Sequence, residues 1–291
     1  MPFKNFYKQH PIAFYFFALY LVYLPTIIFE LSLKLFGISI CEDDYFYKLN
    51  LIEVVSKLLT LLGLILLFSF LKFFPVLKSS VKSFKSSFKS TFLIFMFFLI
   101  ILFLEIFIAI KQKQNFKSLT DIVYNLITVF VRSFIEKLLD CGILANLLAF
   151  KHAKTKKGTF FAIFLSSFIF GITYLLNLTP IALLNITTAA KIFAVFSQIL
   201  YCFMLSSLFT IIYFKCSYNI WVVSILYAFY NYVAEFDLRF LEKNVTFVEY
   251  FSKKNLWELV GYRAVQIIIL ILICLFFLRK NAIEKIIKNI A

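Results

Sequence analysis

The feature that most constrains this chain is a series of long apolar segments separated by short connections rich in lysine. A helix needs about 20 mostly apolar residues to cross a bilayer, whose core offers no water to satisfy backbone polar groups. About eight segments come close to that length, and the last two are shorter. They are residues 12–33, 51–72, 91–110, 121–150, 159–178, 192–214, 218–234 and 264–278. The pattern predicts an all-α fold, a polytopic transmembrane helix bundle of about eight helices.

Composition agrees with a membrane protein and excludes a soluble enzyme, because 63% of the residues are hydrophobic and the mean hydropathy is +0.93. The formal net charge of +15 raises the question of nucleic acid. The positions of the basic residues answer it, since they gather in every second connection. They are Lys4, Lys8, Lys78, Lys82, Lys85, Lys89, Lys151, Lys154, Lys156, Lys157, Lys215, Arg279, Lys280, Lys285 and Lys288. We therefore expect membrane lipid, and no nucleic acid, as the partner of these charges.

The same asymmetry predicts the orientation. Basic connections stay in the cytoplasm, so both termini are expected there, in a multi-pass protein of the cell membrane, with a bacterial inner membrane as the setting. Most of the alternate connections are acidic or balanced, although Lys111, Lys113 and Lys117 break the pattern. Aromatic residues of the outer connection 235–263, among them Phe236 and Phe240, are expected to anchor it at the membrane interface.

Three regions follow from this organisation. Residues 1–120 are expected to form the first three transmembrane helices and a basic cytoplasmic loop. Residues 121–234 form the core helices, which contain the unusual charges described next. Residues 235–291 comprise the outer loop, the last transmembrane helix and a basic tail.

Metal and cofactor sites are not expected. The five cysteines are scattered without a CxxC pair, which disfavours disulfide and zinc-thiolate frameworks. The two histidines, His10 and His152, lie at predicted membrane edges, so no histidine is available deep in a helix to bind a metal. The chain also contains no Gly-rich phosphate loop and no nucleotide fingerprint.

Four charged residues lie within about two turns of the segment 121–150, which otherwise is typical of a membrane-spanning helix. They are Arg132, Glu136, Lys137 and Asp140. Charge inside a membrane is costly and therefore suggests function. In one interpretation the four charges neutralise one another at spacings of three and four residues, which makes burial tolerable without chemistry. In the other, Glu136 is shielded from water and acts as a general base.

Three segments carry a family resemblance. They are Glu-Lys-Leu-Leu-Asp-Cys-Gly-Ile-Leu at 136–144, Ser-Ser-Phe-Ile-Phe-Gly-Ile-Thr-Tyr at 166–174 and Ser-Ile-Leu-Tyr-Ala-Phe-Tyr-Asn at 224–231. Over residues 121–234 the chain resembles the CAAX-protease and bacteriocin-processing family of intramembrane proteases. Members carry Glu-Glu-x-x-x-Arg-Gly, Phe-x-x-x-His and His-x-x-x-Asn motifs on neighbouring helices around a buried hydrophilic site. They typically cleave peptide bonds near the membrane, in prenylated proteins or peptide precursors.

The match to these motifs is partial. Two positions of the catalytic set are retained, Glu136 for the first Glu and Asn231 for the Asn. Phe170 and Gly142 also match. Elsewhere Lys137 replaces the second Glu, Cys141 the Arg, and Tyr174 and Tyr227 the two histidines. The resemblance therefore implies a degenerate member with Glu136 and Asn231 as retained catalytic positions. Its pocket would be lined by Tyr174, Tyr227, Asp140, Lys137, Arg132 and Phe170.

The replacements weaken the expected chemistry. An imidazole accepts a proton near neutral pH, whereas a phenol, with a reference pKa of about 10, is a poor base there. Lys137 also reverses a charge beside Glu136, which would repel a metal ion. Two outcomes remain open for the site. Its tyrosines either fill the space of the original site, or their hydroxyls bind a peptide or a lipid headgroup.

Three hypotheses about function follow. The first, which we favour, is a proteolytically inactive homologue that binds or regulates a peptide or a membrane-protein partner. The second is an active, glutamate-dependent intramembrane endopeptidase. The third is a transporter component that uses Glu105 and Glu136 as an ion or proton pathway.

Overall fold

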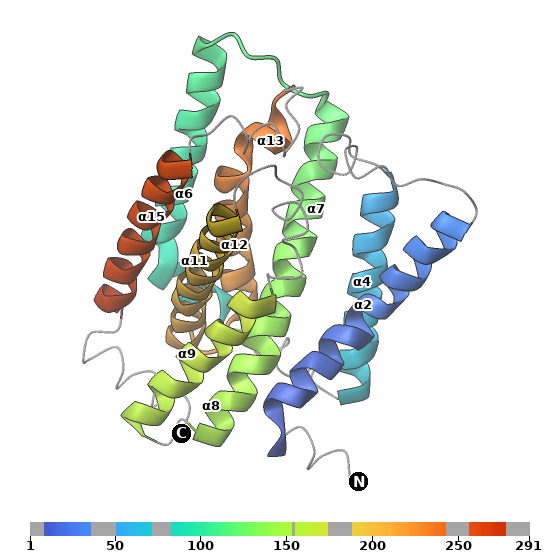
Figure 1. Ribbon diagram of the computed structural model, residues 1–291, viewed down its shortest axis with the longest axis vertical. Coiled ribbons are helices and arrows are strands. Elements are labelled where there is room, and N and C mark those ends of the chain that lie inside the picture. Colours follow the sequence, from blue (N-terminus) through green and yellow to red (C-terminus); the bar gives the residue numbers. More distant parts are fainter. Residues whose placement is uncertain are drawn as a thin grey trace. The chain divides into compact units, whose positions relative to one another are not determined.

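The computed structural model describes residues 9–35, 51–71, 83–152, 155–173, 188–242 and 256–277, and these ranges are almost entirely helical (Figure 1). The helices are α2 (Pro11–Leu35), α4 (Leu51–Leu71), α6 (Phe84–Lys111), α7 (Leu119–Lys137), the π-helical segment η1 (Leu138–Ala145), α8 (Asn146–His152), α9 (Lys156–Thr173), α11 (Thr188–Lys215), α12 (Ile220–Ala234), α13 (Phe236–Phe240) and α15 (Leu256–Phe277). Within the described ranges the only β pairing is an isolated bridge between Phe116 and Leu241. The predicted all-α fold is confirmed.

Each of the predicted apolar segments overlaps a helix. Among the described residues, three helices have a stretch long and apolar enough to cross a membrane, at Pro11–Phe29, Phe84–Lys111 and Val195–Lys215. Shorter apolar helices cover Val55–Ser69, Ile220–Ala234 and Ala264–Phe276. These helices support the expectation of a membrane protein.

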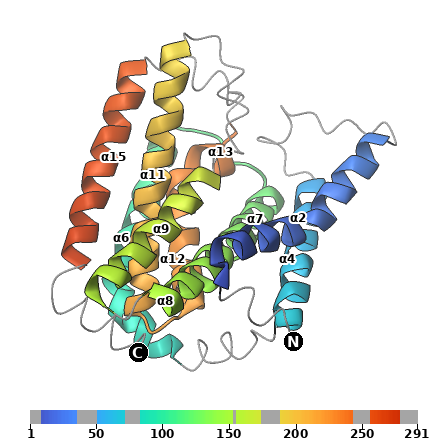
Figure 2. The same ribbon diagram turned by 60° about the horizontal axis from the view of Figure 1, so that its bottom comes forward.

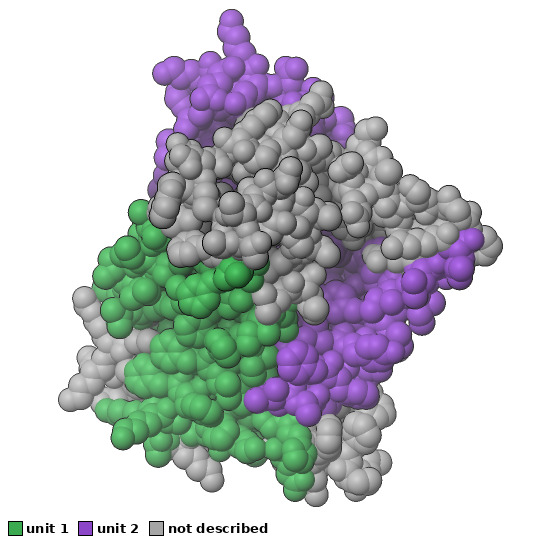
Figure 3. All heavy atoms as spheres, in the orientation of Figure 1, with its two compact units in different colours: residues 1–11, 140–218, 245–291 green, residues 12–139, 219–244 purple. Residues whose placement is uncertain are grey.

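The chain divides into two compact units (Figure 3). Unit 1 comprises residues 1–11, 140–218 and 245–291, and unit 2 comprises residues 12–139 and 219–244. In unit 1, α11 packs against α9 and α15 (Figure 2). In unit 2, α12 packs against α6 and α7, and α4 packs against α7. The boundary between the units at residues 139 and 140 falls inside η1, so the chain passes from unit 2 into unit 1 without leaving helical structure.

The pair α2 and α4 in unit 2 is held by small and hydroxylated residues. A Cβ atom on Gly63 would lie 2.7 Å from the carbonyl oxygen of Val22, so the two backbones are in direct contact there. Thr26 donates a hydrogen bond to the carbonyl of Ser56 at 2.8 Å, and its hydroxyl lies 2.7 Å from that of Thr60. Close approach and interhelical hydrogen bonds of this kind hold helices together in lipid, where hydrophobic association is weak.

Local capping fixes where the two site-bearing helices of unit 2 begin. Ser118 caps α7 by accepting a hydrogen bond from the backbone of Asp121, and its hydroxyl donates to the Asp121 carboxylate at 2.7 Å. Asn219 caps α12 by accepting from the backbone of Val222 at 3.1 Å, and its amide donates to the hydroxyl of Ser83 at 3.0 Å. Side-chain oxygens at these positions satisfy backbone donors that the helices leave unpaired.

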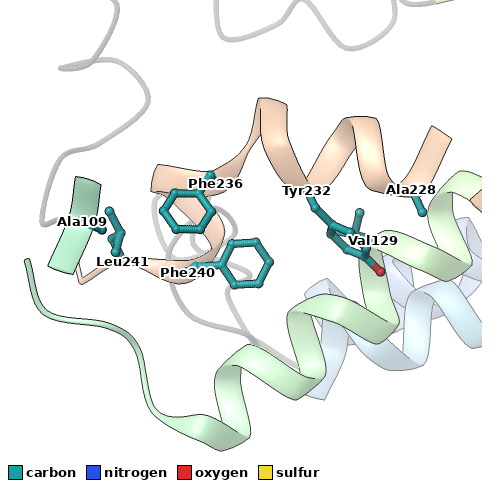
Figure 4. Packing of buried hydrophobic residues seen from close by; sticks show 7 residues of the cluster. All are labelled: Ala109, Val129, Ala228, Tyr232, Phe236, Phe240 and Leu241. Carbon is teal, nitrogen blue, oxygen red and sulfur yellow. The ribbon is translucent and has the colours of Figure 1, made fainter. Parts of the chain in front are cut away.

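An apolar cluster closes one end of unit 2, where α13 follows α12 (Figure 4). It consists of Ala109, Val129, Ala228, Tyr232, Phe236, Phe240 and Leu241. The expectation that Phe236 and Phe240 anchor the outer connection at the membrane interface is wrong, since their exposed fractions are only 4% and 6%. Both rings pack into this cluster because α13, which directly follows α12, packs against α7.

Candidate functional site

A seam of polar contacts runs between α7 and the antiparallel α12 and α13 in unit 2. Its contacts join five pairs, Asn125 with the Arg239 carbonyl, the Leu126 carbonyl with Tyr232, Arg132 with Glu235, Ser133 with Asn231, and Lys137 with Tyr227. As the α7 residue number rises, its partner's number generally falls, as an antiparallel pair requires. Three of the predicted site residues on α7 and two on α12 therefore lie in one continuous region, where α7 packs on α12.

Lys137 and Tyr227, two positions where the chain departs from the family motifs, contact each other. The ammonium nitrogen of Lys137 lies 4.3 Å from the centre of the Tyr227 ring. Both side chains are buried, with exposed fractions of 0% and 2%. A cation over an aromatic face is stabilised by about 2 kcal/mol or more when desolvated. The replaced motif positions thus form a packed contact with each other.

Asn231, a retained motif position, is also engaged. Its side-chain amide donates a hydrogen bond to the hydroxyl of Ser133 at 2.9 Å, and both residues are buried. Its backbone carbonyl accepts from the backbone nitrogen of Glu235 at 2.9 Å. The amide is therefore oriented by α7, and its position is linked directly to that of Glu235.

The Glu235 carboxylate binds two arginine side chains. One carboxylate oxygen accepts from Arg132 at 2.6 Å and the other from Arg239 at 3.0 Å. Burial opposes ionisation of this carboxyl, but the charges and hydrogen bonds of Arg132 and Arg239 outweigh burial and lower its pKa to about 2. Glu235 is consequently a fixed anion at the end of α12.

Glu136, the other retained motif position, lies at the edge of this charge network. Its carboxylate is 3.9 Å from Nε of Arg132, at a spacing of four residues on the helix. Its side chain keeps an exposed fraction of 17%. The predicted pairing of Arg132 with Glu136 thus exists, but Arg132 is much closer to Glu235. The closest carboxylate partner that the structure gives Arg132 is thus Glu235, which lies 103 residues away in the chain.

The other predicted site residues that the structure describes, Asp140 and Phe170, belong to unit 1. Asp140 lies in unit 1, fully buried on η1, and accepts a hydrogen bond from Ser206 of α11 at 2.6 Å. Cys141, next to it, lies 3.8 Å from the hydroxyl of Thr210. Phe170 is buried on α9 in unit 1, and Tyr174 falls outside the described residues. A π-helical segment changes the angular position of the side chains that follow, so Asp140 is not placed as a regular helix would place it.

Sequence reasoning missed several partners in the seam. Glu235 and Arg239 were assigned to the outer connection, and Ser133 was not singled out. The spacing of Tyr227, Asn231 and Glu235 offered a signal, because residues four apart share one face of a helix. That periodicity places Glu235 on the same face of α12 as the two motif positions. Among the described residues, no cluster of three His, Cys, Asp or Glu side chains that suits a metal ion is found.

Comparison with family models matches residues 118–233 to the family described as Type II CAAX prenyl endopeptidase Rce1-like. The predicted family resemblance is confirmed. The matched residues begin at the cap of α7 and end within α12, so they contain all three motif segments. Together with the apolar helices, this match supports a membrane protein that is similar to the CAAX endopeptidases over residues 118–233. Comparisons with curated proteins and with solved structures gave no match.

Proposed function

We propose that this protein is a proteolytically inactive homologue of the CAAX endopeptidases that binds a peptide or a membrane-protein partner within the membrane. The contact between Lys137 and Tyr227 is the observation that carries the proposal. Catalysis by this family's residues needs groups that accept protons or activate water. Here the replaced positions are a cation and an aromatic ring, packed against each other and buried.

The chemistry of the two side chains supports this reading. A tyrosine hydroxyl is protonated near neutral pH, so it can donate a hydrogen bond but is a poor base. A buried ammonium repels a metal ion and cannot act as the missing carboxylate. Glu136, Asn231 and Tyr227 instead provide a small set of polar groups in an apolar bundle, which is typical of a site that orients a ligand.

The proposal is tested with a fluorescent prenylated CAAX peptide and the protein in nanodiscs. We expect saturable binding of the peptide and no product above the level seen with a Glu136→Gln variant. Asn231→Ala should weaken binding, whereas Glu242→Gln, at an exposed position, is the matched control and should bind as the unaltered chain does. Absence of both binding and cleavage would contradict the peptide as the partner.

An active, glutamate-dependent endopeptidase is the second candidate. The observation that favours it is the partial exposure of Glu136, at 17%, because a general base must reach water. In the same assay this candidate predicts a cleaved product that disappears in Glu136→Gln while the protein still folds and binds the peptide. Such a product would overturn the inactive assignment.

We also propose, from the distribution of lysines, that the protein is a multi-pass protein of the cell membrane with both termini in the cytoplasm. The basic segment at the start of α6 supports this orientation. Lys85 and Lys89 are exposed in the first turns of α6, and exposed apolar side chains such as Phe97 and Phe103 follow them along the same helix.

A further inference from the structure

The corner between α12 and α13 is built around Glu235. This residue ends α12 and precedes α13, since its backbone nitrogen donates to Asn231 at 2.9 Å and its carbonyl accepts from Arg239 at 2.9 Å. Its carboxylate binds Arg132 of α7 on one oxygen and Arg239 of α13 on the other. One anion therefore joins three helices of unit 2.

Arg132 is shared unequally between two carboxylates. Its Nη2 lies 2.6 Å from Glu235, whereas its Nε lies 3.9 Å from Glu136. Charge interactions weaken as distance grows, and a hydrogen-bonded contact at the shorter distance adds a directional term that the longer one lacks. The Arg132 guanidinium is thus bound mainly by Glu235. Its distance from the Glu136 carboxylate therefore depends on the contact with Glu235.

The corner itself is anchored to other parts of unit 2. The carbonyl of Arg239 accepts a hydrogen bond from the Asn125 side chain at 2.8 Å. Two backbone hydrogen bonds, from Lys117 to Phe240 and from Glu242 to Asn115, both at 2.9 Å, join the segment after α13 to the connection between α6 and α7. Phe236 and Phe240 of α13 pack in the apolar cluster (Figure 4). These contacts give the corner, and with it Glu235 and Arg239, a fixed position.

We propose that Glu235 and Arg239 are positioning residues for the candidate site, because they hold the Arg132 guanidinium and thereby set the positive charge that stands beside Glu136. This inference rests on the proposed function, because it assumes that Glu136 belongs to the functional site. Its geometry is independent of whether the protein binds or cleaves a peptide. Loss of the Glu235 charge would release Arg132 toward Glu136 and change the environment of that carboxylate.

A double-mutant cycle tests the proposal through unfolding midpoints of the full chain in detergent. Once Glu235→Gln releases Arg132, Glu136 becomes its main carboxylate. We therefore expect the decrease in midpoint caused by Glu136→Gln to be about twice as large in the Glu235→Gln background as in the unaltered chain. In an Arg132→Met background this coupling should vanish.

Two further variants separate positioning from a general loss of structure. Glu235→Asp keeps the negative charge, so in its background Glu136→Gln should lower the midpoint as little as it does in the unaltered chain. In the Arg239→Gln background the decrease caused by Glu136→Gln should be intermediate. Glu242→Gln, an exposed position on the same segment, should leave the effect unchanged. Equal effects of Glu136→Gln in the unaltered and Glu235→Gln backgrounds would overturn the proposal. They would leave the proposed function intact, because only the peptide assay tests it.

Discussion

At the scale of single residues, the site is defined by the side chain that each charged residue contacts. Lys137 meets an aromatic ring, and Arg132 meets Glu235 more closely than it meets Glu136. A lysine or arginine is tolerated inside a helix bundle when such a partner compensates its desolvation. The environment of each charge is therefore set by the side chain it contacts as well as by its own position on the helix.

The Glu235 carboxyl predicts a dependence of stability on pH. Its pKa in the folded protein is about 2, lower than the ordinary value of 4.5. Protonation therefore favours unfolding, so the stability that Glu235 contributes is complete above about pH 4.5 and is lost as the pH falls toward about 2. Unfolding midpoints measured across this range should fall less steeply for Glu235→Gln than for the unaltered chain. Parallel curves for the two proteins would contradict the assignment.

At the scale of elements, the arrangement of unit 2 rests on close backbone contacts and on one polar seam. α2 approaches α4 at Gly63, and α7 pairs with α12 through the contacts of Ser133 with Asn231 and of Lys137 with Tyr227. Both devices suit a membrane, where packing and hydrogen bonds hold helices together. In α7 the seam residues occupy one face, and the following η1 carries Asp140 into unit 1.

The contact at Gly63 predicts a destabilising substitution. Gly63→Ala places a Cβ atom 2.7 Å from the backbone carbonyl of Val22, and a backbone atom cannot rotate away as the end of a side chain does. We expect a loss of about 1–3 kcal/mol, larger than the gain in helix propensity from alanine. Leu66→Ala on the same helix, at a position that is 59% exposed, should change stability by less than about 0.5 kcal/mol. A neutral Gly63→Ala would show that α2 and α4 pack differently.

At the scale of the whole molecule, the apolar helices and the family match support a membrane protein, and the lysines predict its orientation. The long helix α6 is the clearest case, because most of its large apolar side chains between Phe92 and Ile110 are exposed. Such a surface is stable when lipid covers it. Under the positive-inside rule, we expect the lysines at its beginning to lie on the cytoplasmic side.

Orientation is tested by cysteine labelling of α6 in a cysteine-free background. A cysteine in place of Lys85 should react with a membrane-impermeant maleimide only after the inner face is made accessible, whereas one in place of Lys113 should react from outside intact cells. The reverse pattern would contradict the proposed orientation. Labelling of both positions from one side would contradict α6 as a membrane-spanning helix.

Much of the fold was predictable because hydropathy and helix propensity are local properties. Apolar runs of sufficient length specify helices, and the helix positions agree with those runs, including the shorter α12. The retained Glu136 and Asn231, and the replacements at 137 and 227, were also readable from residue identity and spacing. The family match over residues 118–233 covers these positions.

The partners of the site residues depended on contacts between segments distant in the chain. Glu235 lies 103 residues from Arg132, and Asn231 lies 98 residues from Ser133, so neither pair follows from helical spacing. The burial of Phe236 and Phe240 likewise depends on how the chain turns after α12, which hydropathy does not specify. Composition and periodicity thus determine the helices and indicate that they lie in a membrane. The partner of each charged residue is decided only by the tertiary structure, because helix packing determines which side chains come close in space.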